Sequence, residues 1–87
     1  MKTFELEIVT PEGAVYADKA VQLSVMAIDG SRSILANHIP LVTALKSAPC
    51  RIYVDDRTIK EGICSGGVLS VEKEKVRLLC TSFVFNT

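Results

Sequence analysis

The residues able to do nucleophilic or metal chemistry are three cysteines and one histidine. Cys50, Cys64 and Cys80 are separated by 13 and 15 residues, and neither spacing makes a Cys-x-x-Cys zinc or redox motif. One histidine without paired thiols supplies too few ligands for zinc. A Cys–His nucleophilic pair is conceivable, but nothing places a cysteine on a strained turn or at a helix N-terminus, where its pKa would fall. We therefore expect three free, buried thiols, no metal ligand and no catalytic residue.

Ser65-Gly66-Gly67 is the glycine-rich segment that resembles half of a phosphate loop or nucleophile turn. It lacks the Gly-Lys pair and the following helix that those motifs need. Two glycines between apolar strands are more typical of a bulge or of close backbone approach. No cofactor is expected.

Composition limits the partners. The 87 residues carry 10 Lys+Arg and 10 Asp+Glu, so the net charge is zero and nucleic acid is not an expected partner. Apolar runs are too short to span a bilayer, and no signal peptide is visible, so direct membrane insertion is not expected either. We predict one domain, residues 1–87.

Alternation of apolar and polar residues predicts the elements that position these groups. Turn residues recur every 8–12 positions, which favours an antiparallel sandwich or barrel. The strands predicted in this way are 4–8, 21–25, 50–54, 58–64, 68–71 and 76–80. A helix over Ile34–Leu45 is the competing interpretation, but Pro40 lies in its middle and would break it. The segment from Asn37 to Pro40 is therefore predicted as a corner before an extended segment, 41–46.

Three segments then carry a resemblance to a known family. Residues 34–46 (ILANHIPLVTALK) resemble the "GILPNHAPLLTALK" stretch of the epsilon subunit of F-type ATP synthases. Residues 64–71 (CSGGVLSV) resemble its "LSGGFLEV", and residues 6–13 (LEIVTPEG) fit its "L-x-I-V-(T/S)-P-(E/D)-G" opening. The segments have the family's order and separation and cover residues 4–84.

The resemblance implies an all-β fold, a small antiparallel β-sandwich of about ten short strands. It also implies a function: a non-catalytic central-stalk subunit that couples the gamma subunit to the c-ring during ATP synthesis. Its partners would be gamma and the c-ring, on the cytoplasmic face of a bacterial inner membrane and peripheral to it. The alternative is a stand-alone β-sandwich protein-binding module without catalytic activity.

Matching positions give the candidate partner-binding residues. Those carried over for the surface facing gamma or the c-ring are Thr10, Asp29, Gly30, Ser31, Arg32, His38, Thr43, Ser65 and Ser70. For His38 two interpretations stay open: a corner residue bonded to local backbone, or a side chain exposed to the partner.

Two departures from the family pattern are visible. The family's "GELGIL" is Gly-Ser-Arg-Ser-Ile-Leu at residues 30–35, so Ser31 replaces an acid and Arg32 an apolar residue. This change alters the loop expected to meet the c-ring, and Arg32 leads us to expect an acidic partner there. The family's C-terminal helical hairpin is not expected here, because residues after Cys80 have a strand pattern.

Overall fold

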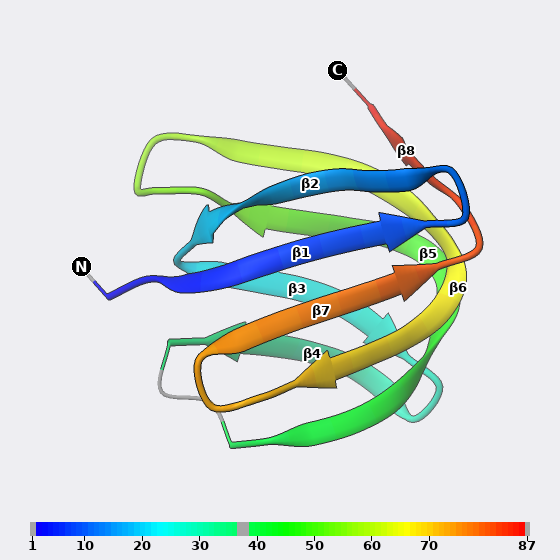
Figure 1. Cartoon of the computed structure of the whole chain (residues 1–87), viewed down its shortest axis with the longest axis horizontal. Coiled ribbons are helices and arrows are strands. Elements are labelled where there is room, and N and C mark those ends of the chain that lie inside the picture. The colour runs from blue at the N-terminus through cyan, green and yellow to red at the C-terminus, as the bar shows by residue number, and fades with distance from the viewer. Residues whose placement is uncertain (1, 37–38, 87) are drawn as a thin grey trace.

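In the computed structural model, which describes residues 2–36 and 39–86, eight strands form one continuous sheet (Figure 1). The strands are β1 (Phe4–Thr10), β2 (Gly13–Ala20), β3 (Gln22–Ala27), β4 (Gly30–Leu35), β5 (Leu41–Tyr53), β6 (Ile59–Val71), β7 (Lys75–Cys80) and β8 (Phe83–Phe85). Within these described ranges, no helix is long and apolar enough to cross a membrane.

The sheet folds over itself because two long strands belong to both of its layers. Its order is β2-β1-β7-β6-β5-β3-β4, and β8 pairs with β6. Residues 67–71 of β6 pair with β7, whereas residues 62–64 pair with β8. Figure 1 shows β6 bending around the right-hand edge of the molecule between these two halves. One layer therefore contains β2, β1 and β7, and the other contains β8, β3 and β4.

The core lies between the layers and is built by the alternation seen in the sequence. Leu6, Ile8, Leu69 and Leu78 come from one layer and Ile52 from the other, each at most 1% exposed. Burying a side chain of this size stabilises the fold by about 1.5–3 kcal/mol. The same alternation turns every second residue of these strands outward. The expected all-β fold is confirmed.

The strand count is lower than expected: eight in the described residues, against about ten predicted. The predicted strands 58–64 and 68–71 are one strand, β6, because Gly66 and Gly67 bend it without ending it. Both glycines have positive φ, 105° and 159°. Likewise 41–46 and 50–54 are one strand, β5. Its register with β3 slips between Leu45 and Arg51, so that Pro49, which has no N–H to donate, lies outside that pairing.

Two features of the sheet were not predicted. β1 and β7 pair in parallel, so the sandwich is not purely antiparallel. This pairing joins segments that are about 70 residues apart in the chain, and alternation within a strand carries no information on strand direction. β2 was missed because only Tyr16 and Ala20 of its eight residues are buried, which leaves little alternation to detect.

The three cysteines are free and buried, as expected. Cys50 lies on β5, Cys64 on β6 and Cys80 at the end of β7, so all three side chains belong to the core between the layers.

Candidate partner-binding surface

A row of apolar side chains crosses the outer face of the layer that contains β1 and β7. Ala44 of β5 is paired with Val68 of β6, Val68 with Leu79 of β7, and Leu79 with Val9 of β1. Their neighbours Leu69, Leu78 and Ile8 are buried, so these residues point to the outside. Val68 and Leu79 are 40% and 46% exposed. The register thus places four apolar side chains side by side on the surface.

Two more apolar residues extend this row. Val42 lies two positions from Ala44 on the same face of β5 and is 72% exposed. Ile28, in the β3–β4 turn, donates its N–H to the Ala44 carbonyl at 3.1 Å and is 61% exposed. We call the six residues Val9, Ile28, Val42, Ala44, Val68 and Leu79 the apolar patch.

A charged ladder borders the apolar patch along the next cross-strand row. Ser70 of β6 is paired with Arg77 of β7, and Arg77 with Glu7 of β1. The Glu7 carboxylate forms ion pairs with two cations, at 3.3 Å from Arg77 Nε and 3.7 Å from Lys75 Nζ. These side chains are partly exposed, so the pairs contribute little to stability. They partly neutralise each other, but one carboxylate faces two cations, so the ladder keeps a net charge of about +1.

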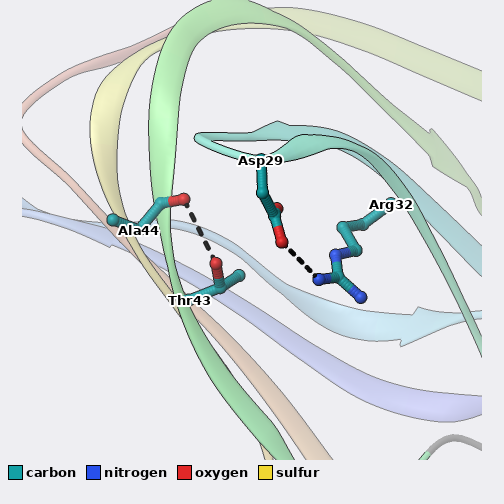
Figure 2. A network of polar contacts seen from close by, with 4 residues as sticks. All are labelled: Asp29, Arg32, Thr43 and Ala44. Atoms are coloured by element: carbon teal, nitrogen blue, oxygen red, sulfur yellow. Dashed lines mark hydrogen bonds and ion pairs between the residues drawn. The ribbon is translucent and has the colours of Figure 1, made fainter.

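A second group of candidate residues gathers at the β3–β4 turn (Figure 2). Arg32 Nη2 and Asp29 Oδ2 are 2.8 Å apart, with exposed fractions of 42% and 57% for the two side chains. The Ile28 N–H donates to the Ala44 carbonyl, which places the neighbouring Thr43 beside the turn. The Thr43 hydroxyl donates to the same carbonyl oxygen at 3.5 Å. We call Asp29, Gly30, Ser31, Arg32 and Thr43 the turn cluster.

The Asp29–Arg32 pair changes what the loop offers to a partner. The sequence led us to expect an acidic acceptor on the c-ring for Arg32, but Asp29 supplies one within the turn. The loop charge is therefore close to zero. Gly30 has φ of 132°, which suits glycine in a tight turn, and Ser31 is exposed opposite Met26.

Thr10 and Ser65 occupy structural positions at strand ends and bends. Thr10 is only 6% exposed, and its hydroxyl lies 3.2 Å from the Gly13 carbonyl and from the Glu12 carboxylate, so it holds the β1–β2 turn. Ser65 is exposed at the bend of β6, with its Oγ 2.8 Å from Ser82 Oγ. The β1–β2 turn, the β6 bend and the β3–β4 turn all lie toward the right-hand edge of Figure 1.

The other candidates divide between the two faces of the sheet or fall outside the described residues. Ser70 points outward between Val42 and Arg77, at the border of the apolar patch. Thr43 is paired with buried Leu69, so it belongs to the inward side of β5 and not to the patch. His38 lies outside the described residues. The candidates in the described residues therefore do not form one continuous surface.

Sequence reasoning missed the apolar patch. Its signal was present: Ile8-Val9, Val68-Leu69 and Leu78-Leu79 are apolar pairs that interrupt strict alternation. In a half-buried strand, one member of such a pair must face outward. The patch became visible only when the register aligned these outward members on neighbouring strands.

The described residues contain no group of three or more His, Cys, Asp or Glu side chains placed to hold a metal ion. What the arrangement can do is bind: an apolar patch suits a protein partner, and a polar turn suits a second contact beside it.

Comparison with known proteins identifies relatives over nearly the whole chain. Residues 3–86 match the family of the ATP synthase delta/epsilon chain, beta-sandwich domain. The ATP synthase epsilon chain of Natranaerobius thermophilus is 45% identical over 80 residues, which cover 91% of this chain and 57% of that protein. The epsilon chain of Bacillus cytotoxicus is 42% identical over 82 residues, 94% of this chain and 61% of that protein. The chain thus spans about three fifths of the length of such relatives.

Solved structures show the same fold. A chain in the Euglena gracilis mitochondrial ATP synthase, in a structure of OSCP, F1 and the c-ring, superimposes with a TM-score of 0.89 at 15% identity, covering 95% of this chain and 53% of that chain. A chain of the Tetrahymena thermophila mitochondrial ATP synthase central stalk and c-ring gives 0.79 at 13% identity, covering 94% and 66%. At these identities the likeness concerns the fold alone.

Proposed function

The chain belongs to the β-sandwich family of ATP synthase delta/epsilon chains, and on that premise we propose that it is a central-stalk subunit of an F-type ATP synthase. In this role it couples the gamma subunit to the c-ring during ATP synthesis. The observation that carries the proposal is the family match over residues 3–86, together with epsilon-chain relatives at 40–45% identity.

The apolar patch is the surface we assign to the gamma subunit. It is contiguous across β5, β6, β7 and β1, and Val42 and Ile28 extend it at two points. Burying outward apolar side chains of this kind drives most stable protein association. Ser70 borders the patch, and His38 and Ser65 remain candidates for the same partner, whereas Thr10 is buried and can act only through the β1–β2 turn that it holds.

The turn cluster is the part we assign to the c-ring. Its charges are paired within the turn, so it offers the ring polar groups and a neutral loop. A contact of that kind sets register and orientation more than affinity.

The chain performs no bond chemistry in this proposal. It acts as a rigid element of the rotor, in a complex peripheral to the cytoplasmic face of a bacterial membrane. The β-sandwich suits this role because its two layers share β5 and β6, which join them covalently and through one continuous hydrogen-bonded ladder.

The test is gamma binding by matched surface variants. Leu79→Asp on the apolar patch should weaken binding to purified gamma subunit at least about tenfold, as loss of a buried contact at an interface does. Ile63→Asp is the control, because Ile63 is also 46% exposed but lies on the β8-bearing half of β6, outside the patch. Isothermal calorimetry measures both, and circular dichroism verifies that each variant is folded.

His38→Ala belongs in the same experiment. We expect it to leave the domain folded, with a loss below ~1.5 kcal/mol, and to weaken gamma binding. If Leu79→Asp and Ile63→Asp change the affinity for gamma equally, the gamma contact does not lie on the apolar patch. A chain that binds no gamma subunit of its own cell would support the stand-alone binding module instead.

A further inference from the structure

Two of the three cysteines meet in the core, although the chain separates them. Cys64 Sγ and Cys80 Sγ lie 3.1 Å apart, and both residues are free thiols. The sequence spacing gave no indication of this pair, because 15 residues intervene. The thiols are free, as expected, but the direct contact of Cys64 with Cys80 was not predicted.

The fold explains the contact and holds it in place. After Cys80 the chain turns through Thr81 and Ser82 and returns as β8, which pairs with the other half of β6. Cys80 is thereby opposite Gly67, and Phe83 is opposite Cys64. The turn is fixed to β6 by two backbone bonds, Thr81 N–H to the Gly66 carbonyl and Ser65 N–H to the Ser82 carbonyl, each 3.1 Å. The two sulfurs therefore lie in contact beside the bend of β6, which these two hydrogen bonds hold to the Thr81–Ser82 turn.

The environment activates one sulfur of the pair. The hydrogen bond from the Cys80 thiol lowers the pKa of Cys64 below its ordinary value, and the Gly66 N–H contributes in the same direction. The same hydrogen bond raises the pKa of Cys80, and burial adds to the rise. Burial raises the pKa of the third cysteine, Cys50, to about 12. Since the thiolate is the reactive form, the lowered pKa favours Cys64 over Cys80 as the nucleophile.

We propose that Cys64 and Cys80 are a two-electron oxidation site at which a peroxide forms an intramolecular disulfide between β6 and β7. The Cys64 thiolate attacks one peroxide oxygen, the O–O bond breaks, and the products are a Cys64 sulfenic acid and hydroxide, which takes a proton to become water. The Cys80 sulfur then attacks the sulfenic sulfur. The S–S bond forms as the S–O bond breaks, and the leaving hydroxide takes the Cys80 proton as a second water. The two thiols lose two electrons and the peroxide gains them.

Geometry permits this step with small movements. A disulfide needs its two Cβ atoms about 3.5–4.5 Å apart, and sulfurs already in contact across fixed strands require side-chain rotation more than backbone displacement. Cys64 is 3% and Cys80 6% exposed, so peroxide has to reach Cys64 past the adjoining turn, where Thr81 is exposed. Cys50 has no hydrogen bond to either sulfur among the described contacts and serves as an internal comparison.

The experiment treats the folded 87-residue chain with hydrogen peroxide, blocks remaining thiols, and maps the tryptic peptides. Each cysteine falls in its own peptide: Ser47–Arg51, Glu61–Lys73 and Leu78–Thr87. We expect two of the three thiols to be lost and a non-reduced link between the second and third peptides in monomeric protein. The Cys50→Ala variant should give the same link, and Cys80→Ser should abolish it and leave a sulfenic acid at Cys64 that dimedone traps.

Several distinct results would contradict the proposed disulfide. Three thiols still titratable after treatment, a link that includes Cys50, a disulfide-linked dimer, or over-oxidised Cys64 without a link would each contradict the proposal. Chain unfolded in urea is the reference: there the pairing should lose its preference for Cys64–Cys80, since the fold alone brings these sulfurs together. Equal pairing in folded and unfolded chain would also overturn it.

Discussion

Gly67 lies where β6 approaches the backbone of β7 too closely for any side chain. A Cβ at this position would overlap the Leu79 carbonyl oxygen and lie 2.9 Å from Cys80 Cα. Gly67→Ala must therefore separate β6 from β7, and we expect it to reduce the free energy of unfolding by more than about 2 kcal/mol, measured by urea denaturation.

Gly13→Ala is the matched control, because Gly13 also has positive φ, 127°, but a Cβ there would meet open space. It should incur only backbone strain, about 1 kcal/mol. If both variants lose the same stability, strain and not the close approach explains the requirement for Gly67.

Cys64 gives a pH prediction. Its pKa is lowered, chiefly by the Cys80 hydrogen bond, so the reactive thiolate persists as the pH falls below the ordinary cysteine pKa of about 8.5. In Cys80→Ala the side-chain donor at position 80 is lost, whereas serine would keep a hydroxyl donor there. The titratable groups near Cys64 are the Cys80 and Cys50 thiols. Peroxide oxidation of Cys64, followed by mass spectrometry, should slow less between pH 9 and pH 7 in the wild type than in Cys80→Ala. Parallel pH profiles would show that Cys80 does not activate Cys64.

At the scale of the strands, alternation predicted which residues face the core but not how the strands are joined. Leu6, Ile8, Val76 and Leu78 are buried as their alternation indicates. Three features depend instead on long-range register: the continuity of β6 through Gly66 and Gly67, the parallel β1–β7 pairing, and the contact of Cys64 with Cys80. A local pattern carries no information about which strand lies next to which, so the apolar patch and the thiol pair could not be predicted from it.

The disulfide, once formed, should stabilise this part of the sheet measurably. It would close a loop with 15 intervening residues, and a loop of that size constrains the unfolded chain by about 3 kcal/mol. We expect the peroxide-treated chain to unfold at a higher urea concentration than the reduced chain, by a shift that corresponds to about 3 kcal/mol of unfolding free energy. The Cys50→Ala variant should gain the same shift, and Cys80→Ser none. A lower midpoint after oxidation would mean that the bond strains the β6 bend.

At the scale of the whole molecule, charge and shape together decide how the chain binds. The net charge of the chain is zero, and the surface assigned to gamma is apolar. It is bordered by the charged ladder of Glu7, Lys75 and Arg77, where one carboxylate pairs with two cations and leaves about one positive charge. Little net field therefore steers the encounter, and the affinity should come from apolar burial, which salt does not screen.

We accordingly expect the dissociation constant for the gamma subunit to change less than about threefold between about 0.05 M and about 0.5 M salt. The heat-capacity change on binding should be negative, which is the mark of apolar burial. Calorimetry at several temperatures and salt concentrations measures both. A tenfold loss of affinity at high salt would instead place the contact on exposed charges, either the ladder or the Asp29–Arg32 turn. Leu79→Asp would then bind as well as Ile63→Asp, and the gamma-binding surface would have to be sought at the edge of the sandwich and not on its outer face.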